Sequence, residues 1–357
     1  MARTDGSWYI VAVSALVLMA QPQACQSNDS PSVVEDKDSV ATYLDGVATE
    51  VIQPQLADMQ TQMDELIIEL TELSEGIDQE EKWADVQQSW VETVTQWQSA
   101  EVLQIAALGS SLTAVDGADL RDDIYSWPLV NPCRIDQVTG GDDNGENQEY
   151  LTSEFLQESL VSVRGLSAME YLIYASTEST CPAQVPPMSN GVWAGFSETD
   201  IHTLRIEYAL VIAGGVKASL QEAQDYWAAG FPIDAYENQT AALNAVYDAM
   251  FYVEELVKER KLAHPMGLKD CTEECHLDVE GIYSDASLEF IAANLQGFEL
   301  LFTLGEAEGG LIAILDELGE KQLGLDMMDN TRNAVTQIEA LDSSLSDLIQ
   351  NDPAAVE

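Results

Sequence analysis

Apolar residues recur along most of this chain at intervals of three and four, which is the spacing of an α-helix that buries one face. Pro54 should interrupt or kink the first such segment. No segment alternates convincingly between apolar and polar residues, as a strand would. The pattern therefore predicts an all-α fold, with helices at about residues 38–73, 79–108, 150–175, 198–229, 235–261, 287–304, 306–318 and 326–348.

Breaks between these helices suggest how the chain is divided. The Pro-, Ser- and Gly-rich stretch 181–195 is the best candidate for a linker, between a first helical bundle at 38–180 and a second at 196–357. In the second half, either Ser284 or Ser287 could cap the helix that follows. We expect two packed antiparallel helical bundles, although no residue-level repeat is strong enough to prove a duplication.

The N-terminus has the pattern of a secretory signal over residues 1–25. Arg3 precedes an apolar run at 8–20, which is too short for a permanent membrane span, and Cys25 stands where a bacterial lipoprotein would be cleaved and lipidated. The polar stretch 26–37 would then be a flexible tether. We expect an exported protein of the bacterial periplasm or outer membrane that contacts the membrane only through a lipid anchor.

The charge balance narrows the possible partners. The chain carries 63 acidic against 14 basic residues, a net charge of −49 spread along its length. Such a surface repels nucleic acid and anionic lipid headgroups, which excludes DNA and RNA as partners. Dispersed acidity suits a saline environment, or else a low-affinity store of cations. The segment Asp142–Glu146 lacks the ligand spacing of a calcium loop and is better interpreted as a solvated acidic turn.

Five cysteines fit an oxidising compartment, with Cys25 as the odd one. Cys133 and Cys181 lie in Pro-flanked loops on either side of one predicted helix, and we expect a disulfide between them. Cys271 and Cys275 are interpreted first as a small-loop disulfide. The alternative is that their thiolates hold a metal together with His276.

The segment Arg164–Tyr174 places a carboxylate on a face that should be buried. At 100° per residue, Glu170 falls between Leu166 and Tyr174, on the same stripe as Ser167. A carboxylate removed from water needs a cation, a metal or several hydrogen-bond donors, or else it takes up a proton. Glu170 is therefore either a structural residue paired with an arginine or part of a functional site.

Gly165, Ser167 and Glu170 resemble the signature Gly-x-His-x-x-Glu of the imelysin family, with serine in the position of the histidine. Four further blocks resemble family elements in the family's order: Ser126-Trp127-Pro128 with Arg134-Ile135-Asp136, Pro265-Met266-Gly267, Glu280-Gly281-Ile282-Tyr283-Ser284 and Asn294-Leu295-Gln296-Gly297. The resemblance spans roughly residues 40 to 350. It implies two helical bundles related by an ancient duplication, with the signature region in the groove between them.

The resemblance also suggests a ligand groove. Arg121, Arg134 and Arg164 fall near the signature blocks, where they could pair with Glu170 or with an anionic ligand. Iron or another divalent metal is the candidate cofactor, with Glu170 and Glu280 as its candidate ligands. The candidate groove residues are Ser126, Arg134, Arg164, Gly165, Ser167, Glu170, Glu280 and Ser284.

The family is named for an insulin-cleaving peptidase of the outer membrane, and relatives are associated with iron acquisition. A metallopeptidase needs two or three histidine or carboxylate ligands, but this chain has only His202, His264 and His276 and no His-Glu-x-x-His. Ser167 lacks the Gly-x-Ser-x-Gly turn of a serine nucleophile. We expect a non-catalytic envelope protein that binds a small ligand or metal linked to iron acquisition. The alternatives are a metal-dependent peptidase of the imelysin type and an envelope module that binds other envelope proteins.

Overall fold

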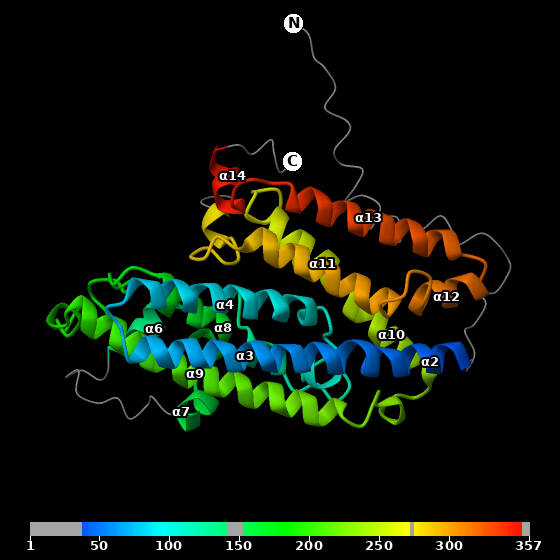
Figure 1. Cartoon of the computed structure of the whole chain (residues 1–357), viewed down its shortest axis with the longest axis horizontal. Coiled ribbons are helices and arrows are strands. Elements are labelled where there is room, and N and C mark those ends of the chain that lie inside the picture. The colour runs from blue at the N-terminus through cyan, green and yellow to red at the C-terminus, as the bar shows by residue number, and fades with distance from the viewer. Residues whose placement is uncertain (1–37, 141–152, 272–274, 352–357) are drawn as a thin grey trace, which may run out of the picture.

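The computed structural model describes residues 38–140, 153–271 and 275–351, and every regular element within them is helical (Figure 1). The all-α prediction is thus confirmed. The predicted signal peptide, Cys25, the tether and the segment Asp142–Glu146 lie outside the described residues. The main α-helices are α2 (Asp38–Gly46), α3 (Gln53–Ser74), α4 (Glu80–Glu101), α5 (Leu120–Ile124), α6 (Pro132–Thr139), α7 (Ser153–Glu158), α8 (Gly165–Tyr174), α9 (Glu198–Trp227), α10 (Gln239–Met250), α11 (Ser287–Thr303), α12 (Gly310–Glu317), α13 (Lys321–Glu339) and α14 (Leu345–Asn351).

The long helices pack through the apolar stripes that the sequence predicts. In α4, Trp90, Val94 and Trp97 are fully buried at helical spacing. Helix α3 buries its own stripe between α4 and α9. Because α9 follows the predicted linker yet packs along α3 and α8, helices from both halves share one hydrophobic core. The division at 181–195 and the duplication stay predictions.

Two stretches of the described residues are π-helical. The segment Val47–Ile52 joins α2 to α3 directly before Pro54, which lies in the first turn of α3. Proline has no amide hydrogen to continue the helical ladder, so the predicted interruption at this point takes the form of a wider turn. The second π-helix, Val253–Ala263, follows α10 and carries Lys261 to the centre of the molecule.

Helices α4 and α11 approach one another unusually closely. A Cβ atom on Gly297 would lie 2.1 Å from the carbonyl oxygen of Ser99, so only glycine fits there without movement. Three residues earlier on α11, Asn294 donates to the Gln98 carbonyl oxygen at 2.8 Å. The Asn294–Gly297 block therefore fixes α11 against α4.

Several predicted boundaries are wrong. The helix expected at 150–175 is broken before Gly165, whose φ of +77° starts α8 afresh. The helix expected at 326–348 is two helices, α13 and α14. Neither Ser284 nor Ser287 caps α11: its N-cap is Ala286, with no side-chain cap bond.

Both expected disulfides are present. Cys133–Cys181 joins α6 to the segment that follows α8, and Cys271–Cys275 closes a small loop. Among the described residues, no helix is both long and apolar enough to cross a membrane.

Candidate functional site

Glu170 lies in the buried helix α8 and exposes only 6% of its surface. Its Oε1 accepts hydrogen bonds from the Tyr283 amide at 3.0 Å, the Ser284 amide at 2.9 Å and the Ser284 hydroxyl at 3.0 Å. These donors belong to a tight turn, 281–285, in which Gly281 and Asp285 have positive φ. The carboxylate therefore ties α8 to a segment more than a hundred residues later in the chain.

Burial dominates the electrostatics of this carboxyl group. Desolvation raises the pKa of Glu170 to about 7, although the bonds from Ser284 and Tyr283 work in the opposite direction. The nearby Glu280 raises the pKa further. Among the ion pairs of the described residues, none joins Glu170 to a basic side chain. The sequence allowed a cation, a metal or hydrogen-bond donors as partners for this carboxylate. Its partners in the structure are neutral hydrogen-bond donors.

Ser167, the serine of the signature, is also hydrogen-bonded within the protein. The Ser167 hydroxyl accepts the Trp127 amide at 2.9 Å, and the Ser126 hydroxyl donates to the Arg164 carbonyl oxygen at 2.8 Å. The Ser126–Trp127 block thus holds the N-terminal end of α8 in place. A Cβ on Gly165 would lie 3.0 Å from the Ile124 carbonyl oxygen, so this end of α8 is closely packed as well.

Two of the three arginines expected near Glu170 make contacts with other groups. The Arg164 guanidinium pairs with Asp123 at 2.6 Å and donates to the Leu156 carbonyl oxygen at 2.7 Å. Arg134 is exposed and bonds to Gln137. The structure therefore brings Glu170 and Ser284 into contact, while Arg134 and Arg164 serve local contacts.

The buried Asp136 has partners of its own. The Tyr171 hydroxyl donates to it at 2.9 Å, as does the Ser179 hydroxyl. The fully buried Arg205 lies 3.5 Å away. Asp136 therefore pairs with Arg205 rather than with Arg134, its neighbour in the sequence.

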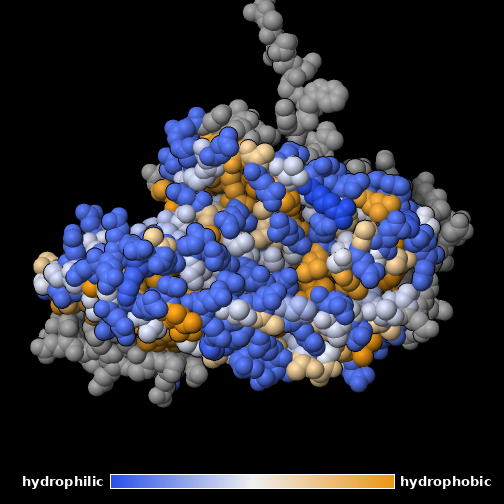
Figure 2. All heavy atoms as spheres, in the orientation of Figure 1, coloured by the Kyte–Doolittle hydropathy of each residue, from blue (hydrophilic) through white to orange (hydrophobic). Residues whose placement is uncertain are grey.

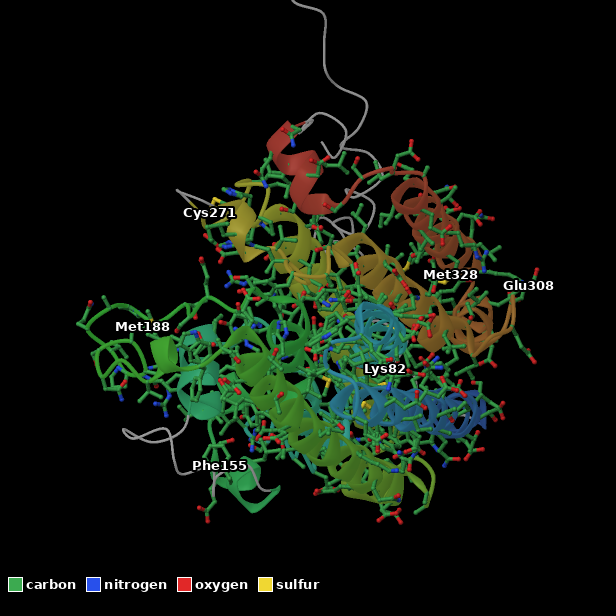
Figure 3. The ribbon with its side chains drawn as sticks, turned by 60° about the vertical axis from the view of Figure 1, so that its left-hand side comes forward. Lys82, Phe155, Met188, Cys271, Glu308 and Met328 are labelled. Atoms are coloured by element: carbon green, nitrogen blue, oxygen red, sulfur yellow. A yellow bond between two sulfur atoms is a disulfide. The ribbon has the colours of Figure 1, made fainter. Side chains whose placement is uncertain are left out.

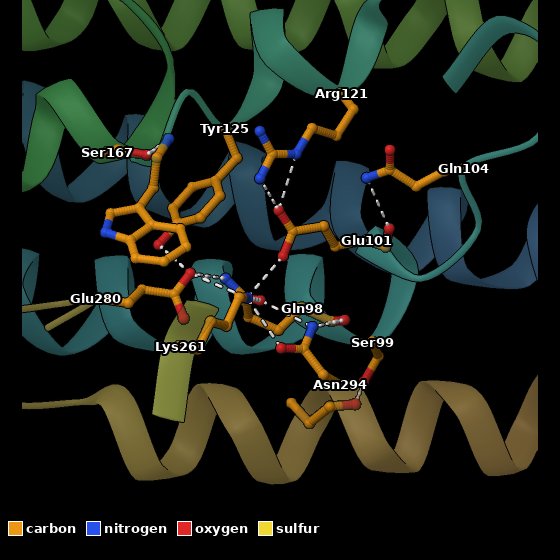
Figure 4. Close-up of polar contacts among 12 residues, drawn as sticks. Gln98, Ser99, Glu101, Gln104, Arg121, Tyr125, Ser167, Lys261, Glu280 and Asn294 are labelled. Atoms are coloured by element: carbon orange, nitrogen blue, oxygen red, sulfur yellow. Dashed lines mark hydrogen bonds and ion pairs between the residues drawn. The ribbon is translucent and has the colours of Figure 1, made fainter. Parts of the chain in front are cut away.

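A second buried cluster surrounds Lys261 (Figure 4). Its ammonium lies 2.9 Å from Glu101 Oε2 and 3.0 Å from Glu280 Oε1, and all three side chains are fully buried. It also donates to Gln98 at 2.6 Å and to Asn294 at 2.9 Å. One cation thus joins α4, the second π-helix, α11 and the loop before it.

The charges in this cluster compensate one another. Arg121 donates to Glu101 Oε1 through Nε at 3.0 Å and Nη2 at 2.7 Å. Burial disfavours ionised Glu101, but Lys261 and Arg121 outweigh it and lower the pKa of Glu101 to about 2. Glu280 differs: burial raises its pKa, Lys261 opposes the rise, and the Glu101 charge adds to it.

Sequence reasoning missed Gln98, Glu101, Lys261 and Asn294 as members of a cluster, although a signal was present. Lys261 continues the buried stripe of Val253 and Val257 at intervals of four. With only 14 basic residues in 357, a lysine on an apolar face is a rare feature.

The buried carboxylates do not fit a divalent metal. Lys261 Nζ is 3.0 Å from Glu280 Oε1, so a metal cation there would face an ammonium. Oε1 of Glu170 already accepts three protein donors. The polar centre therefore acts as a structural junction between distant segments.

Open hollows lie instead along α11. Two of them, of about 590 and 510 Å³, share Gln296 and run between α4 and α13. Figure 1 shows α11 between these two helices, and Figure 2 shows a mostly hydrophilic face with hydrophobic patches in that strip. We call this feature the α11 groove. Its carboxylates are Asp285, Glu289, Glu299, Glu306, Glu339 and Asp342.

One end of the α11 groove adjoins the signature. Asp285, which lines the groove, belongs to the turn whose Ser284 binds Glu170. Thr95 and Ser99 come from α4 in the first half of the chain, and Ile338 comes from α13 in the second. The groove is thus built by both halves and lies beside the buried junction.

Comparisons with known proteins agree with this architecture. A profile of the family Imelysin matches residues 50–356. An imelysin-like protein from Psychrobacter arcticum 273-4 has a solved structure that is similar at a TM-score of 0.64 with 16% identity, covering 89% of this chain and 88% of that one. A protein from Parabacteroides distasonis ATCC 8503, provisionally named iron-regulated protein A precursor, has the same TM-score and identity, with 92% of each chain covered. No curated protein matches.

Proposed function

This chain belongs to the imelysin family, and from that premise we propose that it is an exported, non-catalytic binding protein of the bacterial cell envelope linked to iron acquisition. The name of the Parabacteroides protein describes that protein as iron-regulated and as a precursor. At 16% identity the likeness between the two proteins is one of fold. On the basis of that likeness, our proposal for this chain includes a link to iron and export.

The observation that carries the proposal is the α11 groove. Its two hollows adjoin at Gln296 and are lined by carboxylates, with Asp285 at the end nearest the Glu170 junction. Carboxylate, hydroxyl and amide oxygens are hard donors, which suit iron and iron complexes with exposed positive charge. The ligand in this proposal is iron or an iron-bearing small molecule, held as cargo.

The hydrogen bonds of Ser167 and Glu170 support a function in binding without cleavage. The Ser167 hydroxyl accepts the Trp127 amide, and Glu170 accepts the donors of the 281–285 turn. A nucleophile or general base has to reach the substrate, and these two groups are turned toward the protein. In this proposal the signature holds the groove in shape and has no step of its own in a reaction.

Iron uptake tests the proposal directly. The probe is ferric nitrilotriacetate, dialysed against the purified full chain at physiological salt, with bound iron counted by mass spectrometry. We expect about one iron per chain, and the triple variant Glu289→Gln/Glu306→Gln/Asp342→Asn should bind at least about tenfold more weakly.

The matched control carries the same substitutions on α3. Asp58→Asn/Glu65→Gln/Glu72→Gln removes the same charge from exposed positions outside the groove and should bind iron like the parent. Equal losses in both variants would mean that iron binds the acidic surface diffusely, which contradicts a groove. Cleavage of insulin that stops when a chelator is added would instead support the peptidase alternative.

A further inference from the structure

Cys271, which is disulfide-bonded to Cys275, lies beside two metal-binding side chains that have no part in the function proposed above. His264 is buried, with 7% of its surface exposed. Its Nε2 is 2.9 Å from Asp278 Oδ2. Ligand atoms of His264, Cys271 and Asp278 all lie within 4.8 Å of one another. Figure 3 shows Cys271 at an edge of the molecule.

The second cysteine belongs to the same arrangement. Cys275 is bonded to Cys271 and begins the short helical turn that ends at Asp278. The turn after His264 passes directly against it, because a Cβ at Gly267, where φ is +71°, would lie 3.8 Å from the Cys275 sulfur. The Cys271 sulfur thus lies near the imidazole, and the disulfide keeps the Cys275 sulfur bonded to it.

We propose that reduction of the Cys271–Cys275 disulfide creates a binding site for Zn²⁺ or a similar borderline transition metal, with His264, Cys271, Cys275 and Asp278 as ligands. Two thiolates, one imidazole and one carboxylate are a donor set that suits tetrahedral zinc. Ligand atoms about 2.0–2.3 Å from such a metal are separated from each other by roughly 3.3–3.7 Å. The 2.9 Å between His264 and Asp278 needs only a small opening to reach that separation.

The chemistry balances with a thiol reductant. Two thiols of the reductant give one disulfide of their own, and Cys271 and Cys275 each gain a hydrogen. When the metal binds, both cysteine thiols release their protons, while His264 stays neutral and binds through one ring nitrogen. Two thiolates and one carboxylate carry three negative charges, so a site that holds a divalent ion keeps one excess negative charge. The guanidinium of Arg260, 3.4 Å from His264 Nδ1, lies where it offsets that excess.

This assignment differs from the metal site that sequence alone suggested. The adjacent His276 was the histidine predicted to join the cysteines, whereas the group held together by the fold contains His264 and Asp278. His264 comes from the end of the second π-helix, seven residues before Cys271. While the disulfide is intact, the sulfur ligands are withheld, so metal binding depends on the redox state.

Cobalt binding to the full chain tests the proposal. After reduction with a dithiol and its removal without oxygen, Co²⁺ should bind once per chain. It should give the near-ultraviolet charge-transfer band of thiolate ligation and the intense visible bands of a tetrahedral complex. Zn²⁺ should displace it. His264→Ala should weaken binding by at least about tenfold, while His276→Ala, the matched control one residue after Cys275, should leave binding unchanged.

Reduction also opens Cys133–Cys181, so two further variants separate the effects. Cys271→Ser/Cys275→Ser keeps the other pair and should show no thiolate band after reduction. Cys275→Ser frees Cys271 without any reductant and should bind Co²⁺ with one thiolate, more weakly. The proposal is overturned if the oxidised parent binds Co²⁺ as well as the reduced one, if His264→Ala has no effect, or if Cys275→Ser gives no thiolate band.

Discussion

Replacing Glu170 with glutamine should change how the stability of this protein depends on pH. Burial raises the pKa of Glu170 from its ordinary 4.5 to about 7. Below pH 4.5 the carboxyl group is protonated in the folded and the unfolded chain alike. Between pH 4.5 and 7 the unfolded chain releases the proton and the folded chain keeps it, so stability falls as pH rises.

The pKa difference sets the size of the effect. A pKa change from 4.5 to about 7 corresponds to roughly 3 kcal/mol of folding stability. The parent loses this stability as the pH rises through that window, and above pH 7 the loss stays constant. The amide introduced by Glu170→Gln cannot ionise, so this variant does not lose this stability in that pH window. The variant should therefore gain roughly 3 kcal/mol relative to the parent between pH 4.5 and 8, whatever its stability at the starting pH.

Urea unfolding of parent and variant, followed by circular dichroism in steps of half a pH unit, measures this difference. All other titrating groups, Glu280 included, are present in both proteins, so they cancel in the comparison to first order. A difference between the two proteins that stays flat from pH 4.5 to 8 would refute the reasoning. It would mean that the donors of the 281–285 turn hold Glu170 ionised throughout.

Three other substitutions have expected outcomes that the same unfolding assay measures. Lys261→Met leaves two buried carboxylates without their shared cation and should cost about 3–5 kcal/mol; a loss below 1 kcal/mol would contradict the network. Gly297→Ala forces α11 away from the Ser99 carbonyl oxygen and should cost about 1–3 kcal/mol, whereas Gly214→Ala on α9, where a Cβ meets nothing within 4 Å, should be neutral or stabilising. Ser167→His restores the family histidine but overfills the space beside Trp127, so about 1–3 kcal/mol should be lost and no insulin cleavage gained.

Much of the fold could be predicted because its helices bury stripes that repeat along the sequence. Trp90, Val94 and Trp97 lie in the core for the reason their spacing indicates. The ends of helices were less predictable, since a serine can serve several purposes. Ser284 bonds to Glu170 and Ser287 bonds to the Glu280 carbonyl oxygen, so neither is left to cap α11.

The site was predictable in part. The burial of Glu170 follows from its place on the helix, but its partners lie 113 and 114 residues further along, beyond the range of periodicity. Arg134 is near the signature in the sequence, yet its side chain is exposed on α6. Proximity along the chain grouped Arg134 with Glu170, but the structure does not pair them, because tertiary packing decides which groups meet.

The network around Lys261 also bears on the order in which the molecule is assembled. Glu101 and Arg121 are 20 residues apart and can pair early, but Lys261 is 160 residues from Glu101, and Asn294 is 196 residues from Gln98. Closing such long loops is entropically costly and slow. The buried centre can therefore close only after the chain has been made as far as Asn294. A chain that ends before Lys261 lacks the ammonium that pairs with Glu101, and we expect proteases to cleave it faster than the full chain.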